Sequence, residues 1–147
     1  NKLGETELVN ADSLSWACKN KEGGIQVLFW DFTHTLPGDS VNNQVYYIRD
    51  LPSAPKGKVK VEINGIPEGN YSMEIYKTGY KTNDAYSTYV AMNRPAQLTV
   101  QQVNTIKQLN NGAPVITETI SIDAKGHFGK EINLNENDVY LLNLVRK

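Results

Sequence analysis

The sequence predicts an all-β fold, an antiparallel β-sandwich of about eight strands with a short helical insertion at about residues 83–111. Three observations lead to this prediction. Apolar and polar side chains alternate over several short runs, turn residues separate these runs, and helix signals are confined to one segment. The chain has 147 residues, of which 39% are hydrophobic and 21% charged. Because this is enough for one core without a disulfide or a metal, we expect a single domain over residues 1–147.

The first expected hairpin joins residues 14–18 to residues 25–30 through the tight turn at Gly23-Gly24. Residues 25–30 are apolar on both faces, which is typical of a central strand covered on each side. We therefore expect Trp30 to lie in the core.

Two alternating runs in the middle of the chain predict a second antiparallel pair. Residues 58–63 and 72–76 both place apolar side chains at every second position, and residues 66–70 supply a turn between them. A polar loop at 34–43 and an aromatic run at 45–48 precede this pair. Three further strands are expected near the end of the chain, at residues 115–122, 128–134 and 139–145.

The helical insertion carries its own start and stop signals. Thr99 and Gln102 have the spacing of a capping box, which predicts a helix that ends before Gly112. Upstream, Asn83 is the expected N-cap of a shorter helix over residues 85–92. An insertion of about thirty residues is far longer than an ordinary loop of about 4–6 residues, so we expect it to cover something.

Composition argues against several classes of function. The net charge of −1 gives no basic surface, so neither nucleic acid nor membrane is an expected partner. Cys18 has no second cysteine for a bridge or a thiolate zinc site, and no cofactor or metal is expected. No phosphate-binding glycine motif is present. The sequence leaves the compartment open between periplasm, cytoplasm and the extracellular space.

Tyrosines supply the candidate contact residues. Such side chains present an apolar ring and a polar hydroxyl, which suits both a sugar and a protein partner. The ordinary alternative is that they serve the core, because aromatic residues are also common in strands. The residues expected to contact a carbohydrate or a neighbouring domain are Tyr46, Tyr47, Arg49, Asp50, Tyr80, Tyr86 and Tyr89.

Several segments form a recognisable series in their order and spacing: residues 24–31 (GIQVLFWD), residues 47–52 (YIRDLP), residues 83–86 (NDAY), residues 112–114 (GAP) and residues 137–139 (NDV). Together they resemble the C-terminal β-sandwich of family 39 glycoside hydrolases, and most of all their β-xylosidase branch. The opening residues 1–4 (NKLG) resemble the exit from the catalytic barrel of these enzymes. Asn93 departs from the pattern, since relatives often have glycine there.

The resemblance implies a fragment of a retaining glycosidase, similar to xylan 1,4-β-xylosidases, whose catalytic glutamates lie in a (β/α)8 barrel. Such a barrel takes about 250 residues alone, so we expect it elsewhere in the same polypeptide and expect no catalytic residue in this chain. The leading hypothesis is an accessory domain that braces the barrel and, with residues 34–43 and 46–50, rims its active site. An apolar patch should then mark the contact, through which the separated domain forms a weak homodimer.

Two alternatives remain open. The chain is an independent carbohydrate-binding module that holds plant cell-wall polysaccharide on exposed tyrosine rings, or an immunoglobulin-like domain that binds a protein. The first requires a flat row of solvent-facing aromatic rings.

Overall fold

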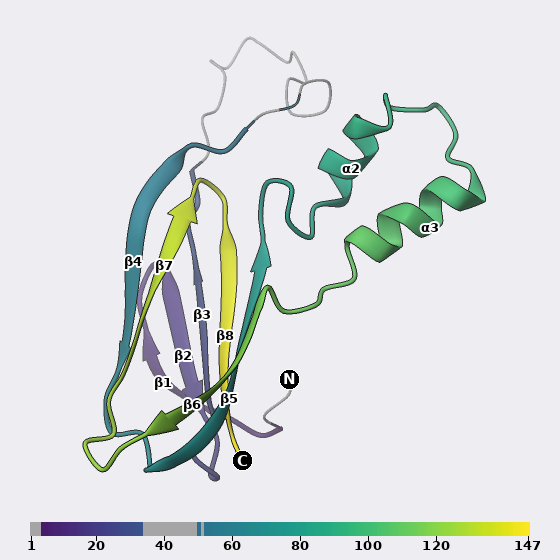
Figure 1. Cartoon of the computed structure of the whole chain (residues 1–147). Helices are drawn as coiled ribbons and strands as arrows, with labels where there is room; N and C mark the ends of the chain where they lie inside the picture. The colour runs from purple at the N-terminus through teal and green to yellow at the C-terminus, as the bar shows by residue number, and fades with distance from the viewer. Residues whose placement is uncertain (1–3, 34–49, 51) are drawn as a thin grey trace.

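The computed structural model describes residues 4–33, 50 and 52–147, which form two antiparallel β-sheets packed face to face with two helices at one end (Figure 1). The predicted all-β sandwich with a helical insertion is confirmed. The aromatic run expected as a strand at residues 45–48 lies outside the described residues, as does the loop at 34–43.

The larger sheet has six strands in the order β1-β2-β3-β8-β5-β6, and the smaller one pairs β4 with β7. The strands of the larger sheet are β1 (Glu7–Ala11), β2 (Ser15–Lys19), β3 (Ile25–Trp30), β8 (Val139–Arg146), β5 (Gly69–Thr78) and β6 (Ile116–Ile122). Those of the smaller sheet are β4 (Pro55–Ile63) and β7 (Phe128–Asn135). The predicted β2–β3 hairpin is confirmed.

The expected pairing of residues 58–63 with 72–76 is wrong. Strand β4 pairs with β7, whereas β5 lies between β8 and β6 in the other sheet. The turn after β4 therefore carries the chain across the sandwich instead of back along the same sheet. Hydrogen bonds Ile66 N to Gly126 O (3.0 Å) and Tyr71 Oη to Pro67 O (2.9 Å) hold this crossing.

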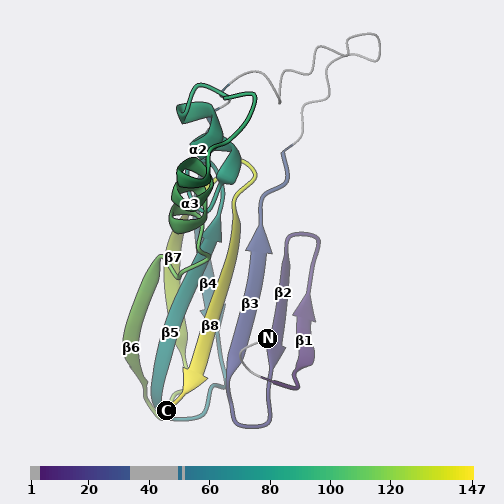
Figure 2. The same cartoon turned by 90° about the vertical axis from the view of Figure 1, so that its right-hand side faces the viewer.

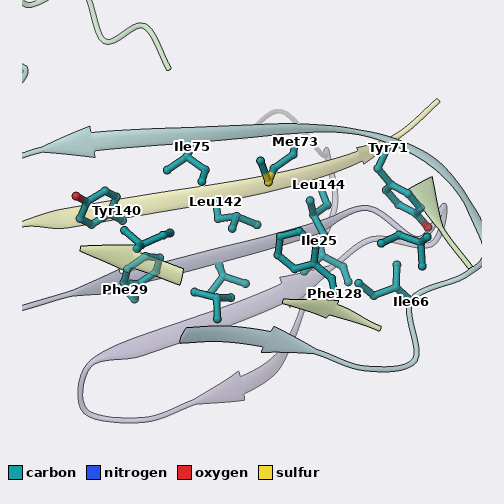
Figure 3. Packing of buried hydrophobic residues seen from close by; sticks show 14 residues of the cluster. Ile25, Phe29, Ile66, Tyr71, Met73, Ile75, Phe128, Tyr140, Leu142 and Leu144 are labelled. Atoms are coloured by element: carbon teal, nitrogen blue, oxygen red, sulfur yellow. The ribbon is translucent and has the colours of Figure 1, made fainter. Parts of the chain in front are cut away.

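The core lies between the sheets, where every second side chain of the central strands points inward (Figure 3). Tyr71, Met73, Leu142 and Leu144 have no exposed surface. Burying one such side chain contributes about 1.5–3 kcal/mol. The central strands β5 and β8 thus anchor the domain, and β5 leads directly into the helical insertion.

The insertion contains helices α2 (Ala85–Ala91) and α3 (Val100–Leu109). The capping box of α3 is confirmed, with Gln102 N donating to Thr99 Oγ1 (3.2 Å) and Thr99 N to Gln102 Oε1 (2.9 Å). The expected cap of α2 is wrong by one residue, because the side chain of Asp84 accepts from Tyr86 N and Ser87 N. Neither helix is long and apolar enough to cross a membrane.

Candidate functional site

One face of the larger sheet is turned away from β4 and β7, and we call it the outer face (Figure 2). Register places Trp16 opposite Leu28, Leu28 opposite Leu141, and Leu141 opposite Tyr76. Directly opposed residues share a face of a sheet, so these four side chains form a continuous row across β2, β3, β8 and β5. The row is half-buried except for Trp16, which is 52% exposed.

Trp30 extends this apolar row, contrary to the expectation that it lies in the core. It alternates with the buried Phe29, is only half-buried, and packs edge-on against Trp16 with ring centroids 5.5 Å apart. Val139 lies opposite Trp30 and is 40% exposed. The outer apolar face thus consists of Trp16, Leu28, Trp30, Tyr76, Val139 and Leu141. Sequence periodicity detected both faces of β3, but it does not tell which face is covered.

The helices stand in front of the outer face at one end of the sandwich (Figure 2). They pack on each other, with Asn110 Nδ2 lying 3.4 Å from Thr88 Oγ1, and neither helix has a buried residue. Val100 and Leu109 on α3 are 79% and 63% exposed. The insertion therefore forms a projecting ledge without a core of its own.

Asn83 fastens the base of this ledge. Its Nδ2 donates to Lys77 O at the end of β5 (2.9 Å), and its Oδ1 accepts from Gly112 N after α3 (3.1 Å). One side chain thus ties the entry of the insertion to its exit. Its backbone has a φ of +48°, in the left-handed region that asparagine tolerates better than most residues.

A polar cluster lies at the tip of the turn before α2. Tyr80 Oη donates to Asp50 Oδ2 (2.9 Å), and Lys81 Nζ lies 3.9 Å from the same oxygen and 4.8 Å from the Tyr80 ring centroid. The hydrogen bond with Tyr80 and the nearby negative charge of Asp50 raise the pKa of Lys81. The cluster presents a hydroxyl, a carboxylate and an ammonium group near the helical ledge.

The structure thus brings two of the seven candidate contact residues, Asp50 and Tyr80, together. Tyr86 and Tyr89 lie on α2 with ring centroids 6.4 Å apart and planes tilted by 39°. Tyr89 Oη donates to Pro95 O (3.2 Å) and so braces the link to α3. The remaining three candidates, Tyr46, Tyr47 and Arg49, lie outside the described residues. Trp16 and Leu141 were not among the seven candidates. Only the pairing of their strands, which places both side chains on the outer face, could have identified them as contact residues.

Comparison with solved structures identifies the fold. A family 39 glycoside hydrolase (GH39) from Xanthomonas axonopodis pv. citri superposes with a TM-score of 0.85 at 26% identity, over 93% of this chain and 26% of the enzyme. The chain is similar to a domain of family 39 glycoside hydrolases. The resemblance predicted from the sequence is confirmed. No protein-family model and no curated protein matches the sequence.

Two Caulobacter crescentus structures show the same fold. A monomeric β-xylosidase from strain CB15 matches with a TM-score of 0.80 at 24% identity, over 92% of this chain and 27% of its own. A GH39 β-xylosidase matches with a TM-score of 0.65 at 21% identity, over 93% of this chain and 24% of its own. This chain therefore spans about a quarter of the length of the enzymes it resembles.

Proposed function

We propose that this chain is the accessory β-sandwich of a β-xylosidase-like glycoside hydrolase, and that it braces a catalytic barrel in the same polypeptide. Its similarity to about a quarter of each GH39 enzyme supports this assignment. The sandwich supplies a rigid support, and the chemistry of glycoside cleavage takes place in the barrel.

The observation that carries the proposal is the outer apolar face. Strand β3 has large apolar side chains on both faces, yet the smaller sheet covers only the face that carries Phe29. Leu28, Trp30 and Leu141 remain half-buried, and Trp16 remains half-exposed. Contiguous apolar surface of this kind marks a contact with another protein surface. The face is the docking surface for the barrel.

The helical ledge extends the docking surface at one end. Because α2 and α3 bury no residue, the apolar side chains of α3 gain a core only when another surface meets them. The cluster of Asp50, Tyr80 and Lys81 then lies at the rim of the barrel. A carboxylate, a phenol and an ammonium are suitable hydrogen-bonding groups for sugar hydroxyls. Asp50 belongs to residues 46–50, which together with residues 34–43 are the segments proposed to rim the active site; of these, only Asp50 lies within the described residues.

The test compares the 147-residue chain with the complete polypeptide encoded by its gene. Trp16→Ser removes the most exposed member of the outer apolar face, and Asn133→Asp on the opposite surface of β7 is the matched control. We expect Trp16→Ser to change the melting temperature of the 147-residue chain little, and to lower both the melting temperature and the aryl-xyloside activity of the complete polypeptide. Asn133→Asp should change neither.

Two outcomes would overturn this function. Hydrolysis of an aryl xyloside by the 147-residue chain, above a heat-killed control, would place chemistry in the sandwich itself. Equal effects of Trp16→Ser and Asn133→Asp on the complete polypeptide would remove the docking role of the outer face. The weak homodimer of the separated chain uses the same face, so Trp16→Ser should abolish it in sedimentation experiments.

The exposed rings of Trp16 and Phe32, 52% and 76% exposed, keep a carbohydrate-binding module as the second candidate. The planes of Trp16 and Trp30 lie 80° apart, whereas a sugar-binding platform requires aligned rings. This geometry favours the accessory role. Affinity electrophoresis of the 147-residue chain on xylan separates the two, because retention that Trp16→Ser abolishes would establish the binding module instead.

A further inference from the structure

The sequence contains two Asn-Gly pairs, Asn64-Gly65 and Asn111-Gly112. In such a pair the backbone nitrogen of the glycine can attack the side-chain carboxamide of the preceding asparagine, a reaction that makes asparagine thermolabile. Glycine favours the attack because it has no side chain in the way and because its backbone rotates freely. The fold then decides whether each pair reacts, since other groups can hold both the nitrogen and the carboxamide.

The two pairs have similar glycine conformations and similar access to solvent. Gly65 has a φ of +74° and Gly112 a φ of +69°, and both have open space where a Cβ would lie. All four residues of the two pairs are exposed. Neither the φ of the glycine nor the access of water therefore distinguishes one pair from the other.

The hydrogen bonds of the two glycine nitrogens do differ. Gly112 N donates to Asn83 Oδ1 (3.1 Å), on the side chain that fastens the base of the ledge. Within the residues that the structure describes, no hydrogen bond engages Gly65 N. Attack at Asn111 must first break a hydrogen bond, which retards it. Gly65 N reaches the carboxamide of Asn64 without this restraint.

Both carboxamide oxygens accept a hydrogen bond. His127 Nδ1 lies 2.9 Å from Asn64 Oδ1, and because an amide oxygen only accepts, the imidazole is the donor. A donor at this oxygen stabilises the negative charge that develops there when the nitrogen attacks. Asn111 Oδ1 likewise accepts from Ala113 N (2.8 Å). The two carboxamides are thus activated alike, and the glycine nitrogens set the difference.

We propose that Asn64 is a site of spontaneous deamidation in the folded chain, with His127 as the donor to its carboxamide oxygen. Hydroxide takes the proton of Gly65 N, the nitrogen attacks Asn64 Cγ, and the Cγ–Nδ2 bond breaks to release ammonia, which takes up a proton from water. Water then adds to one carbonyl of the cyclic imide. Breaking the bond from the nitrogen to Cγ leaves aspartate, and breaking the bond to the backbone carbonyl carbon leaves isoaspartate.

The modified residue lies beside a close crossing of two chain segments. Ile66 N donates to Gly126 O (3.0 Å), and Gly126 packs so closely that a Cβ there would press on Ile66 O. Isoaspartate inserts one carbon into the main chain two residues before Ile66, so we expect it to weaken this crossing. Aspartate leaves the length of the main chain unchanged, and its carboxylate still accepts from His127.

Tandem mass spectrometry of the 147-residue chain, incubated in mildly alkaline buffer and sampled over time, tests this inference. We expect Asn64 to deamidate at least about fivefold faster than Asn111, which is the effect of one neutral hydrogen bond on a rate. In guanidinium chloride the two pairs should react at the same rate, because only the fold distinguishes them. Equal rates in the folded chain, or an undiminished difference in guanidinium chloride, would overturn the inference.

Two variants test the nitrogen and the carboxamide separately. Asn83→Ala releases Gly112 N and should bring Asn111 to the rate of Asn64, with the rate at Asn64 unchanged. His127→Phe keeps a ring without a donor and should slow Asn64 by about twofold to tenfold, with the rate at Asn111 unchanged. An unchanged rate at the targeted asparagine in either variant would contradict the proposal.

Melting temperature measures the consequence for the fold. The isoaspartate form, separated from the aged protein by ion exchange, should melt below the fresh protein, whereas Asn64→Asp should melt close to it. Equal melting temperatures for the isoaspartate form and Asn64→Asp would overturn the expected weakening of the crossing at Ile66.

Discussion

The ion pair between Lys77 and Asp138 gives the sharpest test of how the sandwich is stabilised. Asp138 has no exposed surface, and its Oδ2 lies 2.9 Å from Lys77 Nζ and accepts from Asn135 N (2.9 Å). The side chain of Lys77 is 15% exposed, with Nζ 5.4 Å from the ring centroid of Tyr140. Replacing Lys77 by Met retains most of the aliphatic packing but leaves a buried carboxylate without its cation.

Removing one partner of a buried pair costs about 3–5 kcal/mol, because the other charge stays buried and uncompensated. For a domain of this size each kcal/mol lowers the melting temperature by about 2–4 °C, so Lys77→Met should lower it by about 6–20 °C. Lys58→Met is the matched control. Lys58 Nζ lies 3.1 Å from Glu131 Oε2, but the two side chains are 67% and 59% exposed, and exposed pairs contribute at most about 1 kcal/mol.

Urea denaturation of the 147-residue chain at pH 7, followed by circular dichroism, measures both variants. The midpoint should fall strongly for Lys77→Met and hardly for Lys58→Met, with an unchanged denaturant slope. Equal shifts of the midpoint for the two variants would refute the reasoning from burial.

Burial opposes the charge on Lys77, but its hydrogen bonds with Asp138 and Tyr140 outweigh this and raise its pKa. The stabilisation should therefore be complete below about pH 10.5 and be lost as pH rises through the folded-state pKa.

Three further outcomes are expected. Gly79→Ala should lower the free energy of unfolding by about 1–3 kcal/mol in urea titrations, because a Cβ there would overlap Asp138 Oδ1; no loss would contradict this packing. Asp84→Ala should cost about 0.5–2 kcal/mol of helix stability by removing the α2 cap. Burial opposes the charge of Asp84, but hydrogen bonds from Ser87, Lys81 and Tyr86 prevail and lower its pKa, so this stabilisation is present above about pH 3.8 and is lost as pH falls through the folded-state pKa. Circular dichroism should then show that acid lowers the helix content of the wild-type chain through loss of this cap. In Asp84→Ala, where the cap is already absent, acid should cause no such further loss of α2. Asn83→Ala should increase proteolysis within residues 85–112 while leaving the exchange of β5 and β8 amides unchanged; unchanged proteolysis would show that Asn83 does not fasten the insertion.

Much of the fold followed from local signals. The β2–β3 hairpin, the last three strands and the capping box at Thr99 depend on residues close in sequence, and all are confirmed. Strand β1 was not predicted, because Glu7–Ala11 is exposed at every position and carries no alternation. Asp84 rather than Asn83 caps α2, since both residue types cap helices and only the backbone conformation separates them.

Long-range features required the structure. The turn at residues 66–70 looks like a hairpin turn in sequence, but local residues do not specify whether the chain returns to the same sheet or crosses to the other. The contact between Asp50 and Tyr80 spans thirty residues and depends on where two loops meet. The alternation of side chains along β3 shows that Trp30 and Phe29 lie on opposite faces. Which of the two faces is buried depends on where the smaller sheet packs, and this is not encoded locally.

Hydroxyl-radical footprinting of Trp16 tests the central proposal most directly. In the 147-residue chain this indole is 52% exposed and should be oxidised readily. In the complete polypeptide, docking on the barrel should cover it and reduce its oxidation by at least about tenfold, in proportion to the surface lost. Equal oxidation of Trp16 in both proteins would contradict the assignment of the outer face as the surface that braces the barrel.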